Sequence, residues 1–171
     1  MGWFFSYAHT EKKHVVEDIT SNFGSSNPTI RCLAHSVVGN VLWSVWEVDT
    51  PEKAERFIRC DLLRYDRNDQ CWGYKDMDEG MHPYYYSCPL RFLSMAPVAC
   101  QAWRDNVIKY HAAQKDKRAK RASIQVGQTW KLRAGCTPTQ VKIVSVKPLR
   151  GIANGVRYQI RSTYLDCQIE G

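Results

Sequence analysis

The sequence lacks the features that mark several common classes of protein. Its 171 residues contain no uninterrupted apolar run of the roughly 20 residues that a membrane-spanning helix needs. The most apolar stretches, 37–46 and 90–100, are broken by glycine, proline, arginine or polar residues. There is no phosphate-cradling Gly-x-x-x-x-Gly-Lys and no Gly-x-Ser-x-Gly elbow, which argues against standard nucleotide hydrolases and serine hydrolases. No internal repeat or low-complexity segment is present.

Paired cysteines are also missing. The seven cysteines are an odd number and occur singly, without a Cys-x-x-Cys pair. This pattern fits neither a disulfide framework nor a zinc ribbon, so we interpret them as reduced thiols. The first residues lack the basic start and long apolar core of a secretory signal. We therefore expect a cytoplasmic protein with no membrane partner and no cofactor.

Positive charge is concentrated in the last third of the chain. Up to Trp103 there are ten Lys or Arg against thirteen Asp or Glu, whereas residues 104–171 hold fourteen against four. The formal net charge of +7 therefore hides a division into −3 and +10. Such an uneven distribution indicates that the two parts do different jobs.

Residues 1–95 are predicted to form an α+β body. A short strand at 3–7 precedes a helix, whose apolar residues run at helical spacing from Val15 to Phe23 and which ends at Gly24. Period-two patterns and turn residues then predict an antiparallel meander of four strands, at 30–37, 41–48, 56–65 and 70–75. The sheet is expected to bury one face against a helix, using some of Ile30, Cys32, Trp43, Val45, Phe57 and Leu63.

Two further parts are predicted after the body. Residues 96–122 form a basic connecting helix packed on the body, beginning at Pro97 and ending near Arg121. Residues 123–171 form a small β-rich domain with strands at 126–134, 139–147, 156–163 and 166–170. The predicted fold class is thus α+β: an antiparallel four- to five-stranded sheet with one packed helix, a long amphipathic basic helix, then a small SH3-like β-barrel.

The basic residues of this region are the main candidates for a binding site. Lys/Arg clustering attracts phosphate backbones, and each neutralised phosphate releases counterions, so such binding weakens steeply with salt. The alternative is a helix face that is merely solvated, or that docks on the acidic part of this chain or of another copy. The candidates for binding nucleic acid or a partner are Arg104, Lys109, Lys115, Lys117, Arg118, Lys120, Arg121, Lys131, Arg133, Lys142, Arg157 and Arg161.

An acidic loop offers a weaker alternative from a different class, an enzyme. Asp76, Asp78, Glu79 and His82 have the ligand types for Mg²⁺, Mn²⁺ or a transition metal, and a strand would point residues 76 and 78 the same way. Capping of the loop is the simpler use of these carboxylates. Cys88 precedes a helix start, where a thiol pKa can fall, so a nucleophilic Cys/His pair is the other enzymatic option.

Three consecutive tyrosines form a second candidate surface. Tyr84, Tyr85 and Tyr86 offer large rigid contact areas with polar tips, which is typical of protein-binding hot spots. Packing beneath the basic helix is the alternative use of these rings.

Three short segments carry a resemblance to a known family. They are residues 1–5 (Met-Gly-Trp-Phe-Phe), residues 73–79 (Gly-Tyr-Lys-Asp-Met-Asp-Glu), and Cys88-Pro89 ahead of a helix that bears Trp and Arg. Together they resemble an uncharacterised family of small proteins of phages and mobile elements, over roughly the first two thirds of the chain plus a β-rich tail. Where that pattern usually continues through Gly-Pro, this chain has Gly-Met-His-Pro at 80–83. The resemblance brings no known activity.

The resemblance and the charge division lead to one functional expectation. Small proteins of such elements often block host defence or handle nucleic acid, which favours a binding protein over a metabolic enzyme. We expect a protein of the host-cell cytoplasm that binds nucleic acid or a nucleoprotein complex, as an inhibitor of anti-CRISPR or anti-restriction type. A host defence protein is the other expected partner. The rival hypothesis is a metal-assisted hydrolase or transferase that uses the acidic loop or Cys88.

Overall fold

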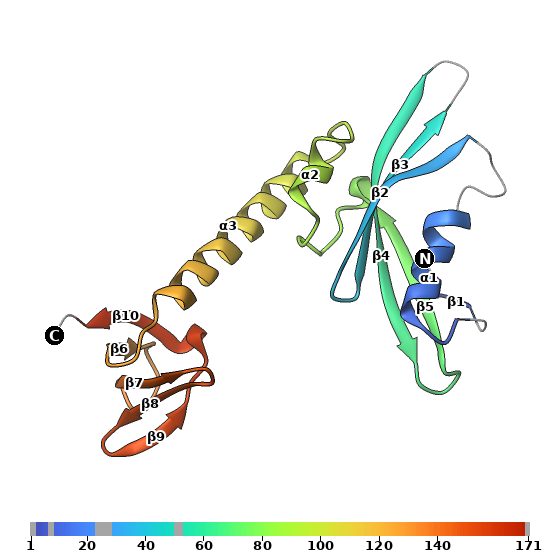
Figure 1. The fold of residues 1–171 in the computed structure, drawn as a ribbon. Coiled ribbons are helices and arrows are strands. Elements are labelled where there is room, and N and C mark those ends of the chain that lie inside the picture. Colours follow the sequence, from blue (N-terminus) through green and yellow to red (C-terminus); the bar gives the residue numbers. More distant parts are fainter. Residues whose placement is uncertain (1–2, 7–8, 23–28, 50–52, 170–171) are drawn as a thin grey trace. The chain divides into compact units, whose positions relative to one another are not determined.

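The computed structural model describes residues 3–6, 9–22, 29–49 and 53–169 (Figure 1). The chain divides into two compact units, Met1–His111 and Ala112–Gly171, called unit 1 and unit 2 below. The predicted division into 1–95, 96–122 and 123–171 differs from this one. Helix α3 (Gln101–Ser123) is not a separate part, because its first turns belong to unit 1 and its last turns to unit 2.

Unit 1 contains an antiparallel five-stranded sheet in the order β1-β5-β4-β3-β2. Strands β2 to β5 form the predicted meander, and the short N-terminal strand pairs with β5. The predicted strand starts agree with the structure to within two residues, since period-two patterns and turn residues are local signals. The strands are β1 (Phe4–Ser6), β2 (Ile30–Val38), β3 (Val41–Asp49), β4 (Ala54–Asp66) and β5 (Cys71–Asp78).

Both faces of this sheet are buried, which corrects the prediction of one buried face. Helix α1 (Lys12–Asn22) packs Val15 and Ile19 on one face, in a cluster with Leu42, Trp46 and Leu63. The other face packs on α2 (Leu90–Leu93) and the first turns of α3. As a result β3 is buried at every residue from 41 to 47. The predicted end of the first helix, at residues 23–24, lies outside the described residues.

The predicted inward residues therefore divide between two cores. Trp43 and Val45 face α2 and α3, where the Trp43 and Trp103 rings lie 5.7 Å apart. Leu63 belongs to the core under α1, with Ile30, Cys32 and Phe57 packed against it. Successive side chains of a strand point to opposite faces of the sheet. In unit 1 helix α1 packs on one face, and α2 and the first turns of α3 pack on the other.

A buried ion pair fixes where α3 begins. The 3₁₀ turn η1 (Glu79–Met81) places the Glu79 carboxylate against Arg104, with the guanidinium Nε 2.5 Å from one oxygen and Nη2 2.9 Å from the other. The same carboxylate accepts hydrogen bonds from the backbone N–H groups of Ala99 and Cys100. Arg104 in turn donates to the carbonyls of Leu93, Ala96 and Pro97.

This network explains why the helix begins at residue 101 rather than at the predicted Pro97. A carboxylate distant in sequence binds the backbone N–H groups of the two residues immediately ahead of the helix, and its negative charge lies at the helix N-terminus, where the helix dipole favours it. The carbonyls of residues 96 and 97 are occupied by Arg104 outside the helix. The signal that sets this boundary is therefore a tertiary contact.

Unit 2 contains a second antiparallel five-stranded sheet, in the order β10-β6-β7-β8-β9. Its core gathers Ile124, which directly follows α3, and Trp130, Ile143 and Leu165 from three strands. The tight turn between β8 and β9 uses Asn154 and Gly155, both at positive φ, which is typical of Asn-Gly in a two-residue hairpin turn. The strands are β6 (Thr129–Leu132), β7 (Gln140–Val146), β8 (Leu149–Ala153), β9 (Val156–Gln159) and β10 (Leu165–Ile169).

Strand β8 was predicted to be a loop. Pro148 and Gly151 are turn residues by composition, but Gly151 lies inside the strand. A Cβ at Gly151 would lie 2.2 Å from Cγ2 of Val141 on β7, so the missing side chain allows close packing of the two strands. The glycine is required by packing and not by a turn.

The first prediction concerns the buried ion pair. Arg104→Met leaves the Glu79 carboxylate buried without its cation, and loss of one partner of such a pair costs about 3–5 kcal/mol. We expect urea unfolding to show a loss of that order in the free energy of unfolding. Lys109→Met, at an exposed position on the same helix, is the control and should change it by less than about 0.5 kcal/mol. Equal stability of the two variants would contradict the structural role of the pair.

Candidate functional site

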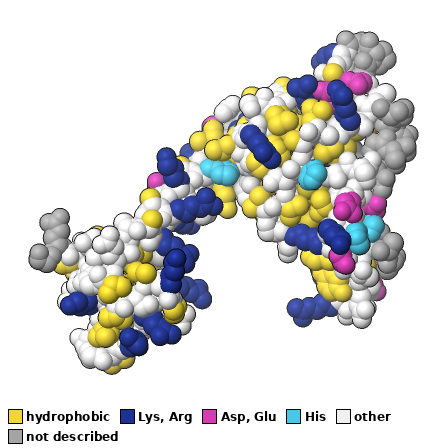
Figure 2. All heavy atoms as spheres, viewed as in Figure 1, with side chains coloured by type: hydrophobic (Ala, Val, Ile, Leu, Met, Phe, Trp, Pro, Cys, Tyr) yellow, Lys and Arg dark blue, Asp and Glu magenta, His cyan; other side chains and the backbone are white. Residues whose placement is uncertain are grey.

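Two adjoining hollows in unit 2 are lined by cations and by no carboxylate. One, of about 330 Å³, lies between the last turns of α3 and residues 133 and 162–163; the other, of about 500 Å³, lies beside the β7–β8 turn. They share Arg121 and Ser162, so they adjoin one another, and the two together are called the basic groove below. Figure 2 shows Lys and Arg side chains gathered on this unit. The cations that line the groove are Lys117, Arg118, Lys120, Arg121, Arg133, Lys147 and Arg161.

Helical spacing places one side of the groove. Gln114, Lys117, Arg118 and Arg121 follow the i, i+3, i+4, i+7 pattern, so they form a single stripe along α3. The opposite side comes from the segment that leads into η2 (Ser162–Tyr164). Ser162 and Thr163 add hydroxyl groups there, and hydroxyls and amides commonly accompany Lys and Arg in phosphate contacts.

Lys120 fixes this arrangement. Its Nζ donates to the backbone carbonyls of Leu165 and Asp166, at 2.5 and 2.9 Å, and lies 5.8 Å from the centre of the Trp130 ring. These contacts attach the last turns of α3 to β10 and β6. Lys120 is therefore a positioning residue at the edge of the groove.

The cations of unit 2 are not neutralised within the unit. Unit 2 holds twelve Lys or Arg against three Asp or Glu. Within residues 112–169 no Lys or Arg forms an ion pair with a carboxylate. In unit 1, by contrast, Arg31, Arg56, Arg59 and Arg104 all do. An anion that enters the groove therefore meets cations for which no carboxylate of the described part of unit 2 competes.

A second set of cations lies on the solvent-facing side of the sheet in unit 2. Lys142 pairs in register with Ile152, which pairs with Arg157, so these three side chains share one face. Lys131 and Arg150 lie on the same face. We call this surface the outer sheet face. Because the core lies on the other face, the predicted set of binding residues is divided between two surfaces.

Arg104 was wrongly predicted to be a binding residue. Its side chain is only 7% exposed and is bound to Glu79 inside unit 1. Lys109 and Lys115 are exposed on α3 but do not line the groove. Lys147, which is absent from the list of predicted binding residues, also lines the groove.

The acidic loop does not assemble a metal site. Asp78 caps η1 by accepting from the N–H of Met81 at 3.0 Å, and Glu79 is bound to Arg104. Asp76 lies 3.9 Å from the guanidinium of Arg59. Within the described parts of the chain, no group of three or more His, Cys, Asp or Glu side chains could hold a metal ion. Asp76, Asp78, Glu79 and His82 therefore do not form a common site for a metal ion.

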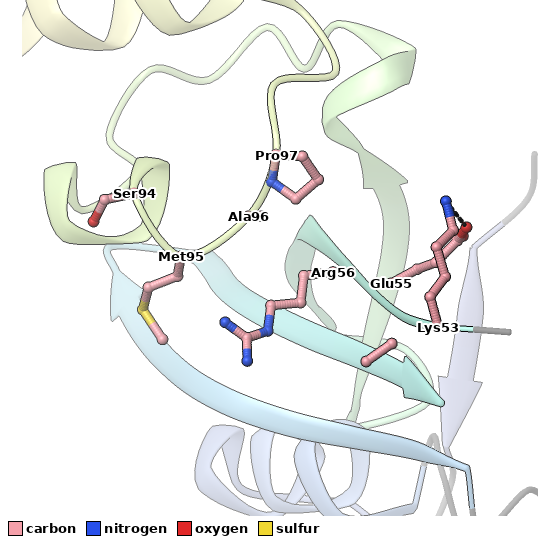
Figure 3. Close-up of a pocket in the computed structure, with 8 residues that line it drawn as sticks. Lys53, Glu55, Arg56, Ser94, Met95, Ala96 and Pro97 are labelled. Carbon is pink, nitrogen blue, oxygen red and sulfur yellow. Dashed lines mark ion pairs between the residues drawn. The ribbon is translucent and has the colours of Figure 1, made fainter. Parts of the chain in front are cut away.

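A hollow of about 650 Å³ in unit 1 carries no free charge. It lies between β4 and the segment 94–97 (Figure 3). Lys53 pairs with Glu55 at 3.1 Å, and Arg56 pairs with Glu47 at 2.5 Å. The hydroxyl of Ser94 donates to the carbonyl of Arg91. Its polar lining side chains are thus engaged in local contacts.

The three tyrosines have different environments. Tyr84 is 85% exposed and Tyr85 is 40% exposed, whereas Tyr86 packs against the core under α3. The indole N–H of Trp103 donates to the carbonyl of Tyr85 at 3.1 Å. A partner surface at this place would therefore rest on Tyr84 and the outer part of Tyr85.

No family model, curated protein or solved structure matches this chain. The structure is that of an α+β protein with two antiparallel five-stranded sheets, and its second unit carries a groove lined by cations that form no ion pair with a carboxylate of residues 112–169. No described helix is long and apolar enough to cross a membrane.

The second prediction concerns Cys88, the candidate nucleophile. Its side chain is fully buried, and burial raises the pKa of the thiol to about 12, so the thiolate is scarce at neutral pH. We expect iodoacetamide at pH 8 to modify the exposed Cys167 and to leave Cys88 unmodified in the folded protein, as read by peptide mass spectrometry. Faster modification of Cys88 than of Cys167 would restore the nucleophile hypothesis.

Proposed function

We propose that this protein binds nucleic acid through the basic groove of unit 2. The observation that carries the proposal is the pair of adjoining hollows lined by seven cations, none of which has a carboxylate partner within residues 112–169. Phosphate contacts made by Lys and Arg supply most of the affinity of non-specific nucleic-acid binding. Hydroxyl and amide groups beside the cations suit the same ligand.

Electrostatics supports this choice over a merely solvated helix face. Like charges held close together repel one another and destabilise the compact state. A polyanion relieves that repulsion at every contact, whereas water leaves it in place. Docking on the acidic unit of another copy is the competing use, and it predicts self-association that salt disrupts.

We further propose that unit 2 is a small SH3-like barrel. Five short antiparallel strands, with the last strand paired to the first, support this description. The 3₁₀ turn η2 lies immediately before that last strand.

The resemblance of residues 73–79 to proteins of phages and mobile elements supplies the proposed biological setting. There the groove would contact the nucleic acid of a host defence complex, and the protein would inhibit it.

The third prediction tests the groove directly. The triple variant Lys117→Gln, Arg118→Gln, Arg121→Gln removes three cations and keeps residues that favour helix. For duplex DNA and for single strands, we expect weaker binding, and we expect the slope of log K against log salt to shrink by about two to three, at roughly 0.7–0.9 per phosphate. Fluorescence anisotropy over a salt series measures both quantities.

The matched control removes three cations from the outer sheet face, as Lys131→Gln, Lys142→Gln, Arg157→Gln. Both triple variants have the same net charge, so an effect of overall charge alone would weaken them equally. We expect the control to retain most of the wild-type slope. Equal losses in both variants, or no salt-sensitive binding by the wild-type protein, would contradict the proposal.

A further inference from the structure

A third hollow in unit 2 continues the basic groove with a different chemistry. It has a volume of about 140 Å³, and Gln159 and Ile160 belong both to it and to the groove. Leu132, Val141 and Ile160 provide an apolar lining. We call it the apolar hollow. The apolar hollow, unlike the groove, is lined by no Lys, Arg, Asp or Glu.

Two tyrosine rings line this hollow. Tyr158 packs against the core of unit 2 and is partly buried, whereas Tyr164 is 47% exposed. A partly fixed ring beside a freely accessible one offers flat apolar surface to another ring. The Gln159 amide and the Thr137 hydroxyl provide hydrogen-bonding groups in the same lining.

Backbone hydrogen bonds hold the hollow and the groove together. The N–H of Arg133, a groove residue, donates to the carbonyl of Tyr164 at 2.9 Å. The N–H of Tyr164 donates to the carbonyl of Arg161, a second groove residue, at 2.9 Å. The backbone of the exposed tyrosine is thus hydrogen-bonded to that of two groove arginines.

We propose that the apolar hollow takes an unpaired base of a single-stranded nucleic acid whose phosphates lie in the basic groove. This inference rests on the proposed function and deepens it, because it names the strandedness of the ligand. A cationic track beside aromatic rings is the combination that binds single strands without strong sequence preference. In a duplex the bases are stacked inside, so a duplex fills the groove and leaves the hollow empty.

A proline-rich peptide is the competing occupant of a tyrosine-lined hollow. The flanking cations decide against it. The adjoining groove is lined by seven cations without carboxylate partners in the described part of unit 2, which attract a polyanion and give a neutral peptide no advantage. Its binding is therefore an outcome that the experiment must exclude.

The fourth prediction uses three probes that separate base contacts from phosphate contacts. They are an oligothymidylate of about twelve nucleotides, an abasic strand of the same length, and a duplex of the same length. The full-length protein is titrated with each by fluorescence anisotropy. We expect Tyr164→Ala to weaken oligothymidylate binding about tenfold, since stacking on one aromatic ring contributes roughly 1–3 kcal/mol per base. Binding of the abasic strand and of the duplex should stay within about twofold.

Two control variants show whether the effect requires the ring of Tyr164 itself. Tyr164→Phe keeps the ring and should bind oligothymidylate as the wild-type protein does. Tyr84→Ala removes an exposed tyrosine of unit 1 and should have no effect on any probe. Alkylation of Cys136, which also lines the hollow, should slow when oligothymidylate is bound and not when the abasic strand is bound.

The outcomes also distinguish this inference from the proposed function. The base-binding role of the hollow is refuted if Tyr164→Ala binds all three probes like the wild-type protein, or if a decaproline peptide rather than oligothymidylate binds the hollow. Binding in the groove would still stand. If the Gln triple variant of α3 and the wild-type protein bind every probe equally, both proposals fail. If Tyr164→Ala loses about tenfold in affinity for oligothymidylate and keeps its affinity for the other two probes, both proposals are supported.

Discussion

The buried pair of Glu79 and Arg104 is the contact on which the packing of unit 1 around the start of α3 depends. It satisfies backbone donors ahead of α3 and carbonyls that follow α2, so it joins η1 to both helices. Burial of two charges is tolerated only when hydrogen bonds complete their shells, and no buried side-chain nitrogen or oxygen of the described residues lacks a partner. The same contact removes Glu79 from any metal site and Arg104 from any binding surface.

The two units handle charge in opposite ways. In unit 1, acidic side chains are bound internally, as with Glu47 between Arg31 and Arg56 and Asp61 beside Arg59. Those partners hold the pKa of Glu47 below its ordinary value. In unit 2 the cations have no such partners within residues 112–169, and packing around Lys120 and Trp130 fixes the backbone that carries them. The charge division seen in the sequence therefore corresponds to a structural difference. Several arginines of unit 1 form ion pairs with carboxylates of the same unit, whereas no Lys or Arg within residues 112–169 does so.

Local signals in the sequence predicted much of the fold, and tertiary contacts account for the rest. Period-two strands and the turns at residues 39–40 and 154–155 depend on neighbouring residues, so they were predictable. The start of α3, the strand around Gly151 and the burial of Arg104 depend on residues distant in sequence. The basic stripe on α3 could be predicted from the sequence because helical spacing is a local signal. The apolar hollow combines residues of β6, β7, β9 and η2, and no pattern along the sequence brings these elements together.

Chemical-shift mapping tests the central claim most directly, because it locates the ligand on the folded chain without any substitution. In a titration of ¹⁵N-labelled protein with oligothymidylate, we expect the largest amide shifts at residues 114–121, 133 and 159–164, with smaller changes at Lys142 and Arg157. Shifts that are largest on the outer sheet face or within unit 1, or that are absent at low salt, would contradict a nucleic-acid site in the basic groove.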